Sequence, residues 1–233
     1  GVLCTCGIDV AEDAPAPKRG RSQSVRLQLQ LDLGKLGCAQ CTLDKEPLKH
    51  PKMEASGAEF PTFYVLGEAN GKNEDEQGEH FVGKSGELLR GRDDDRESYP
   101  ARIPDKWLPF TRWNNSVNCR PPGNRDPTPL ELGCCRSRVE ADIVRTKPQV
   151  ILAFGAIALQ WLTRAQPSPE EHGGGRQAAE ALERGLPLIS NWRGRRLPVR
   201  VGNHTCWAYV MGHPAWLLRS MNDRRMGEAH VAA

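Results

Sequence analysis

The sequence predicts an α/β fold, a three-layer α/β/α sandwich around a short, mainly parallel central sheet. Short apolar segments, such as residues 63–66 (FYVL) and Val150–Phe154 (VILAF), are typical of buried strands. Segments with helix-start signals lie between them, and strands that alternate with helices indicate a parallel sheet covered by helices. The 233 residues are enough for one large domain of this kind or for two small ones.

Both ends of the chain are expected to lie outside the folded part. Residues 1–24 form a polar, proline-containing leader, expected to be disordered, and residues 226–233 form a tail, which leaves a single domain at residues 25–225. The leader lacks the basic-then-apolar pattern of a signal peptide. No apolar run approaches the roughly 18–20 residues that span a bilayer. We therefore expect a cytoplasmic protein without contact to a membrane. We also expect a monomer of a prokaryotic or phage-like kind.

The first half of the chain is expected to hold few regular elements. They are a short helix at 25–36, a loop at 42–60, the strand at 63–66, a helix at 85–90 and an insertion at 91–106. Residues 25–36 alternate like a strand, but their place before a cysteine pair favours a helix. The strand at 63–66 is expected to end at Gly67, where a loop rich in glycine and carboxylates begins.

The second half continues the alternation of strands and helices. Strands are expected at 110–117, Val150–Phe154 and 207–211, an extended segment at 197–201, and helices at 129–146, Ala156–Thr163, 178–184 and from 215 onward. Thr128 is expected to cap the first of these helices and Pro129 to occupy its first position. Residues 165–189 are interpreted as a second insertion.

Polar side chains follow several of the predicted strands. Glu68 comes soon after the first strand, Asn115 lies near the end of the second, and His213 follows the last. Right-handed crossovers bring the carboxyl ends of parallel strands to one edge of the sheet, so we expect these groups to converge there. Carboxylates held among backbone N–H groups are candidate acid or base groups. The segment 63–86 is therefore the candidate active site.

Eight cysteines in a chain expected to be cytosolic indicate a metal site or a cluster more than a disulfide framework. Cys38 and Cys41 form a C-x2-C pair, and Cys119 lies far downstream. Cys134 and Cys135 follow about 16 positions later. Four thiolates suit an iron–sulfur cluster or a structural zinc ion, and the spacing does not separate the two. The remaining cysteines are unassigned: Cys4, Cys6 and Cys206.

Two further patterns bear on the partner. The net charge is only +3, but arginines gather around Arg193 and Arg219. Such groups suit contact with phosphates, and solvated surface charge explains them equally well. Residues 78–85 (GEHFVGKS) match the phosphate-binding loop of P-loop NTPases. That loop should follow a buried strand, whereas the acidic run KNEDEQ precedes it here, so we set nucleotide hydrolysis aside.

Several segments together resemble family 4 uracil-DNA glycosylases. The segment at 67–86 (GEANGKNEDEQGEHFVGKSG) is similar to that family's first motif, roughly GEAPGxxEDxxGxPFVGxSG. NSVNCRPPGNRDPTPLEL, KPQVILAFGAIA, WRGRR and GHPAWLLR resemble its later motifs, in the same order. The resemblance runs from about residue 31 to residue 219, and several motifs in one order make it specific.

The resemblance implies a [4Fe–4S] cluster in a structural role, with zinc as the fallback. The implied ligands are Cys38, Cys41, Cys119 and Cys135. Cys135 is preferred to Cys134 because the Cys-Arg pair of the family aligns with it.

The chain departs from the family pattern at three positions near the predicted site. Asn70 and His80 stand where the family usually has proline, and Asn118 stands where it often has lysine. Asn70 removes the fixed φ that proline would impose on the first loop. His80 adds a titratable group beside the pocket, and both changes are expected to bear on the choice of base.

The resemblance also implies a role for each site residue. The base-binding residues are Gly67, Ala69, Phe81, Asn115 and Arg219, and the catalytic residues are Glu68, Glu74 and His213. Phe81 is implied to stack on a base that has left the helix. Asn115 is implied to pair with uracil O4 and N3–H at once, the opposite of the pattern that cytosine offers.

The catalytic residues are implied to act on the leaving base and on water. His213 donates to uracil O2 as negative charge grows on the base. Glu74 activates water and Glu68 supports the pocket. Arg219 and Arg193 are expected to contact the flanking phosphates.

We therefore expect a monofunctional DNA glycosylase that hydrolyses the N-glycosidic bond of deoxyuridine in DNA. One alternative is a glycosylase for another deaminated base, such as hypoxanthine or xanthine. An alternative of a different class is a non-catalytic protein that binds uracil or single-stranded DNA.

Overall fold

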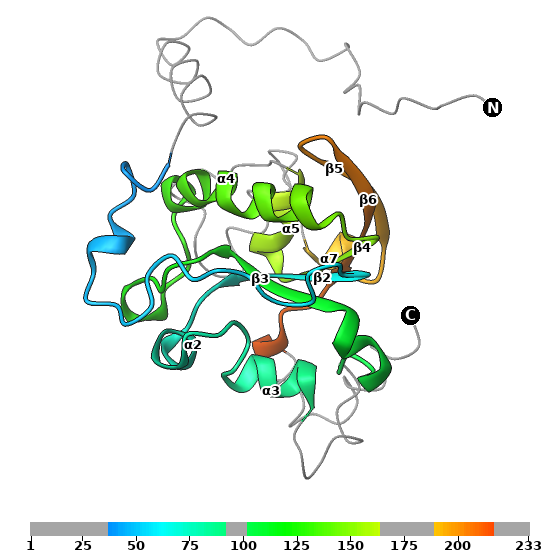
Figure 1. Cartoon of the computed structure of the whole chain (residues 1–233), viewed down its shortest axis with the longest axis horizontal. Coiled ribbons are helices and arrows are strands. Elements are labelled where there is room, and N and C mark those ends of the chain that lie inside the picture. The colour runs from blue at the N-terminus through cyan, green and yellow to red at the C-terminus, as the bar shows by residue number, and fades with distance from the viewer. Residues whose placement is uncertain (1–36, 92–101, 164–188, 217–233) are drawn as a thin grey trace, which may run out of the picture. The chain divides into compact units, whose positions relative to one another are not determined.

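The computed structural model describes residues 37–91, 102–163 and 189–216 (Figure 1). These residues belong to one compact unit of the chain, Lys35–Ala233. Several expectations lie outside the described residues: the leader at 1–24, the helix at 25–36, most of both insertions, the helix at 178–184, and the tail. Within the described residues, no helix has the length and apolar character needed to cross a membrane.

The described residues form a mixed sheet whose central strands are parallel. Its strands are β1 (Ser56–Gly57), β2 (Phe63–Ala69), β3 (Thr111–Val117), β4 (Val150–Phe154), β5 (Arg196–Val201) and β6 (His204–Met211). They lie in the order β1-β3-β2-β4-β6-β5. The pairs β3–β2, β2–β4 and β4–β6 are parallel, and the short β1 and the hairpin strand β5 pair antiparallel at the edges. The prediction of a mainly parallel sheet is confirmed.

Helices cover both faces of this sheet (Figure 1). They are α2 (Lys72–Gln77), α3 (Lys84–Arg90), α4 (Pro129–Thr146), α5 (Ala156–Thr163) and α7 (Ile189–Trp192), with 3₁₀ turns at Leu43–Lys45, Asp105–Phe110 and Pro122–Asn124. The predicted start of α4 is confirmed: Thr128 Oγ1 accepts the Glu131 N–H at 3.3 Å, and Glu131 Oε2 accepts the Thr128 N–H at 2.7 Å. This capping box is worth about 1 kcal/mol.

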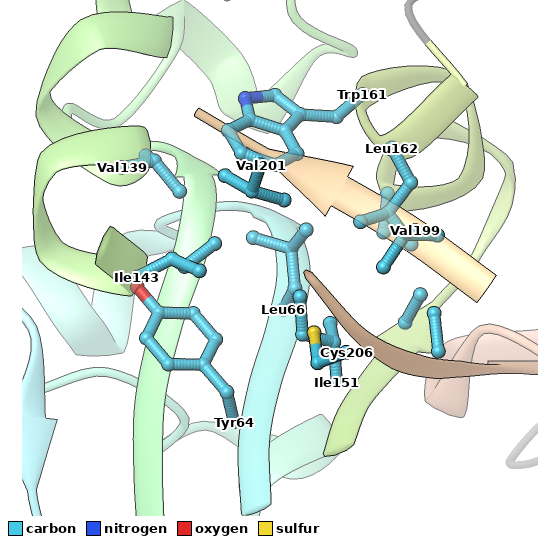
Figure 2. Packing of buried hydrophobic residues seen from close by; sticks show 13 residues of the cluster. Tyr64, Leu66, Val139, Ile143, Ile151, Trp161, Leu162, Val199, Val201 and Cys206 are labelled. Carbon is cyan, nitrogen blue, oxygen red and sulfur yellow. The ribbon is translucent and has the colours of Figure 1, made fainter. Parts of the chain in front are cut away.

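Alternate side chains of β2 point to opposite faces of the sheet and pack against different helices. Tyr64 and Leu66 pack with Val139 of α4 and Trp161 of α5 in the larger core cluster, which Figure 2 shows. Val65 points the other way, toward Leu89 of α3. Full burial of each such apolar side chain stabilises the fold by about 1.5–3 kcal/mol. The three layers therefore follow from the period-two pattern of the strand.

A partly buried ion pair fixes α4 against the sheet. Arg112 of β3 donates to both carboxylate oxygens of Asp142, at 2.7 and 2.8 Å, and the Tyr64 hydroxyl donates to the same carboxylate at 2.9 Å. Burial by itself would raise the pKa of Asp142, but the hydrogen bonds from Arg112 outweigh it and lower that pKa. The carboxylate therefore stays charged and oriented.

Two boundaries near the predicted site differ from the expectation. Strand β2 does not end at Gly67 but continues to Ala69, because Gly67 pairs with Asn115 and Ala69 with Val117 of β3. The acidic run after it is not a loop but the helix α2. Its first turn is closed by Glu74, whose Oε2 accepts the Gly71 N–H at 3.1 Å. The strand β1 and the helix α7 were also not predicted.

Candidate active site

The carboxyl ends of the parallel strands enclose a cavity of about 290 Å³. Seven of the predicted site residues line it: Gly67, Glu68, Ala69, Glu74, Phe81, Asn115 and His213. They come from β2, from α2, from the turn before α3, from β3 and from the segment after β6. The predicted convergence on one sheet edge is therefore present. Arg219 lies outside the described residues.

Gly67 leaves the space that brings two of these side chains together. A Cβ atom built on Gly67 would overlap Asn115 Oδ1 and Phe81 Cζ. Glycine is the residue that permits such a close approach to the backbone. The amide oxygen of Asn115 and the ring of Phe81 therefore border the same stretch of β2.

The ring of Phe81 is held by an unusual backbone conformation. Phe81 has φ +56°, which is uncommon for a residue other than glycine. Arg90 holds this turn by donating to the His80 carbonyl at 3.0 Å and to the Phe81 carbonyl at 3.2 Å. The Phe81 ring packs on Trp113 at a centroid distance of 5.5 Å. A Cβ atom at Gly86 would overlap the Phe81 carbonyl, so this turn also requires that glycine.

The side-chain amide of Asn115 is held by Asn70 and His80, two residues at which the chain departs from the family pattern. Its Nδ2 donates to Asn70 Oδ1 at 2.8 Å and lies 3.2 Å from His80 Nδ1. Asn70 Nδ2 in turn donates to the Asn118 carbonyl at 2.9 Å. Asn70, His80 and Asn115 are all buried. Buried amides need such partners, so the network fixes the orientation of Asn115.

His213 and Glu68 face each other across the cavity wall. His213 Nδ1 accepts the Ala215 N–H at 3.1 Å, so in the neutral ring the proton resides on Nε2. That Nε2 lies 3.8 Å from Glu68 Oε2. Burial, together with the nearby Asp126 carboxylate, raises the pKa of Glu68 to about 7. The pair therefore offers a fixed N–H donor beside a carboxyl group that exchanges its proton near neutral pH.

Glu74, which lines the cavity, accepts hydrogen bonds from the backbone of two separate segments. Its Oε1 accepts the N–H groups of Val82 at 3.1 Å and Gly83 at 2.8 Å, and its Oε2 accepts that of Gly71. Glu74 is half-buried and its neighbour Asp75 is buried. The acidic run is therefore not simply solvated charge, and Glu74 joins the start of α2 to the start of α3.

A second pocket is lined by cysteines from three parts of the chain. They are Cys38, Cys41, Cys119, Cys134 and Cys135. The Lys52 N–H donates to Cys119 Sγ, and the Asn118 N–H to Cys135 Sγ, each at 3.2 Å. Burial raises the pKa of Cys135 to about 12 and that of Cys134 to about 11. Among the described side chains, no group of three or more His, Cys, Asp or Glu is arranged to hold a metal ion.

Comparison with known proteins identifies the family. The profile of the uracil DNA glycosylase superfamily matches residues 56–232. The chain belongs to the uracil-DNA glycosylase superfamily. Type-4 uracil-DNA glycosylases are similar to it: that of Archaeoglobus fulgidus is 33% identical over 127 residues, which cover 54% of this chain and 59% of the relative. The resemblance to family 4 is confirmed.

Two further type-4 members of the superfamily match longer parts of the chain. The protein of Thermotoga maritima is 32% identical over 158 residues, or 68% of this chain and 67% of the relative. That of Pyrobaculum aerophilum is 32% identical over 194 residues, or 81% of this chain and 86% of the relative. The match to the Archaeoglobus fulgidus protein, in contrast, covers 59% of that relative, which is less than two thirds of its length.

The cavity also contains residues that were not among the predicted site residues. Asn70, Asn124 and Arg125 also line it. Arg125 is held by Glu131, at 2.6 and 2.9 Å. The segment NCRPPGNR contains two of these three residues, and its family motif was the signal that could have found them. Arg193, which was expected to contact a phosphate, lies with its guanidinium carbon 5.1 Å from the centroid of the Trp216 ring.

Proposed function

We propose that this protein is a monofunctional DNA glycosylase that hydrolyses the N-glycosidic bond of deoxyuridine in DNA. The products are free uracil and an abasic site, as in base excision repair. The observation that carries the proposal is the meeting of Phe81, Asn115 and His213 in one cavity of about 290 Å³. Together they supply a stacking surface, an amide and a fixed N–H donor for one flipped base.

Phe81 and Asn115 bind the base in this proposal. The ring of Phe81 lines the cavity, and Arg90 holds the turn that carries it. A planar base can therefore stack on this ring without the entropy loss of first ordering the Phe81 side chain. Asn115 meets the base edge with its side-chain amide. Gly67 and Ala69 supply backbone close to that edge, where a larger side chain would fill the cavity.

His213 stabilises the leaving base. When the bond between C1′ and the base nitrogen breaks, the electron pair goes to the base, which becomes an anion. The Nε2–H of His213 donates to uracil O2, where part of this charge collects. The donor is already oriented by the Ala215 N–H, so little reorganisation is needed during the reaction.

The two carboxyl groups act on the sugar side. Glu74 orients the water whose oxygen bonds to C1′, and the proton lost by this water leaves the site or reaches the base. Three backbone N–H groups hold the Glu74 carboxylate in place, which suits positioning. Glu68 supports the pocket, and in its ionised form it offsets positive charge on the sugar.

The cysteine pocket is proposed to hold an iron–sulfur cluster in a structural role. Thiols from three distant parts of the chain line this one pocket, and four thiolates suit an iron–sulfur cluster or, as the fallback, a structural zinc ion. The N–H groups of Lys52 and Asn118 donate to two of the sulfurs, and such hydrogen bonds stabilise thiolate ligands. The cluster would be held by Cys38, Cys41, Cys119 and Cys135. It would cross-link segments that are distant along the chain and so stabilise the fold.

Uracil-containing DNA is the proposed partner, and the protein is proposed to act as a monomer. Arg193 and Arg219 are proposed to contact phosphates beside the flipped nucleotide. One assay tests the whole proposal: incubation with labelled oligonucleotides that carry a single uracil, hypoxanthine, xanthine or cytosine, followed by cleavage of abasic sites. Strand cleavage at uracil supports the proposal. Cleavage only at another base, or tight binding of uracil without product, would replace it with one of the alternatives.

A further inference from the structure

Asn70 and His80, which stand where the family usually has proline, meet at the amide of Asn115. We propose that Asn70 and His80 determine specificity by locking that amide with Oδ1 toward the base, so that the site takes bases whose ring nitrogen carries a proton and rejects cytosine. The inference rests on the proposed function and deepens it. Neither residue needs to touch the base, because both act through Asn115 as positioning residues.

The orientation of Asn70 follows from a group that can only accept. Asn70 Nδ2 lies 2.9 Å from the backbone carbonyl of Asn118. A carbonyl oxygen has no proton to donate, so the NH₂ end of Asn70 must face it. Its Oδ1 then faces Asn115 and accepts from Asn115 Nδ2 at 2.8 Å. The direction of this chain of hydrogen bonds is therefore set by the backbone.

His80 takes the second proton of the same amide. Its Nδ1 lies 3.2 Å from Asn115 Nδ2. His80 is fully buried, and burial, the largest influence on it, lowers its pKa to about 4. The ring is therefore neutral at physiological pH. Because Asn115 Nδ2 can only donate, His80 Nδ1 must be the ring nitrogen without the proton, which places the proton on Nε2. Both N–H bonds of Asn115 Nδ2 are then engaged.

The oxygen of Asn115 is left for the base. Within the described part of the chain, no group donates to Asn115 Oδ1. This oxygen lies against Gly67, beside the Phe81 ring, at the cavity. Asn115 therefore presents an acceptor and no donor to the base. The second contact expected from the sequence, a donor to uracil O4, has to come from another group.

An acceptor at this point separates bases by the proton on their ring nitrogen. Uracil N3–H donates to Asn115 Oδ1, and the ring N–H of hypoxanthine or xanthine does the same. Cytosine has a lone pair at N3, so two acceptors would face each other. To serve cytosine the amide would have to flip, which loses both hydrogen bonds and turns Oδ1 toward the acceptors of Asn70 and His80. The lock makes this flip costly.

Matched variants of His80 separate the lock from simple packing. Asparagine places its Oδ1 where histidine has Nδ1, so His80→Asn keeps the acceptor. Glutamine places its amide farther out, so His80→Gln removes the acceptor while keeping a polar side chain of similar size. Asn70→Ala removes the other acceptor. The double variant His80→Gln/Asn70→Ala leaves Asn115 free to turn.

The measurement compares the affinities of two oligonucleotides that differ only in the target base. They carry 2′-fluoro-2′-deoxyuridine or 2′-fluoro-2′-deoxycytidine, because the electron-withdrawing fluorine slows cleavage and allows binding to be measured by fluorescence anisotropy. We expect the wild type and His80→Asn to prefer uracil equally. The preference should fall about tenfold in the double variant, the effect of losing one or two hydrogen bonds. His80→Gln alone should lie between.

Two outcomes overturn the inference separately from the proposed function. If the wild type excises uracil but the preference is unchanged in both His80→Gln and the double variant, the lock is refuted and the function stands. Variants that fail to fold are recognised by circular dichroism, and His80→Gln, the milder change, then decides. If the wild type neither excises nor prefers uracil, the proposed function fails and the inference fails with it.

Discussion

Exchanging Glu68 for glutamine should make the protein more stable above pH 7. Burial, followed by the charge and hydrogen bond of the neighbouring Asp126, raises the pKa of Glu68 from its ordinary value of 4.5 to about 7. The folded protein keeps a proton on Glu68 that the unfolded chain releases near pH 4.5. Ionisation of the folded carboxyl therefore costs stability as the pH rises. Glutamine has the shape of the protonated carboxyl and does not ionise.

The size of the effect follows from the two pKa values. The difference between 4.5 and about 7 corresponds to about 3 kcal/mol. The Glu68 side chain is 25% exposed, so this figure is the upper end. The contribution of Glu68 is fully present below pH 4.5 and is lost as the pH rises through about 7. Glu68→Gln should match the wild type near pH 4.5 and exceed it at about pH 8.5, by up to roughly 6–12 °C in Tm.

Thermal unfolding followed by circular dichroism at the two pH values measures this. Glu76, an exposed residue that pairs with Lys72 at 3.7 Å, provides the matched control, and Glu76→Gln should change stability by less than about 0.5 kcal/mol. A Glu68→Gln variant whose advantage is the same at both pH values, or that is less stable than the wild type at high pH, would refute the reasoning.

Four further changes test the site itself. His213→Ala should lower uracil excision by about 10²–10³-fold with the circular dichroism spectrum unchanged, because it removes a preplaced donor; an unchanged rate removes His213 from the mechanism. Asn115→Asp should lower excision, because a carboxylate cannot donate to the acceptors that hold Asn115, and wild-type kinetics would contradict this base-reading role. Gly67→Ala should raise KM for uracil DNA, because its methyl group overlaps Asn115 Oδ1 and Phe81 Cζ; normal kinetics would show that the pocket has room to adjust. Cys135→Ser should give preparations with less bound iron, and a colourless, zinc-containing wild type would settle the metal the other way.

Local chemistry made much of the fold predictable. Thr128 and Glu131 stand at capping positions that depend on neighbours along the chain, and the helix α4 begins where they indicate. The apolar run VILAF is β4, with the expected bounds. The convergence at the sheet edge followed from strand direction alone. Such signals are carried by a few adjacent residues, so one sequence is enough to recognise them.

The features that were missed depend on contacts between distant residues. Gly67 continues β2 because Asn115 of β3 pairs with it, and nothing adjacent to Gly67 signals that partner. Asn70 follows β2 and His80 lies between α2 and α3, and only the folded chain brings both to the amide of Asn115 in β3. The resemblance to family 4 marked both residues as departures, but the role proposed for them follows only from the packing.

The strand β3 serves both pockets of the molecule within a few residues. Asn115 lies in it, and just beyond its end Asn118 offers its N–H to a cysteine sulfur and its carbonyl to Asn70. The segment that borders the candidate active site therefore also borders the cysteine pocket. Damage at the sulfur-lined side should reach Asn70, and through it Asn115, by way of the single residue Asn118. Losses of selectivity in cysteine variants therefore need not signal general unfolding.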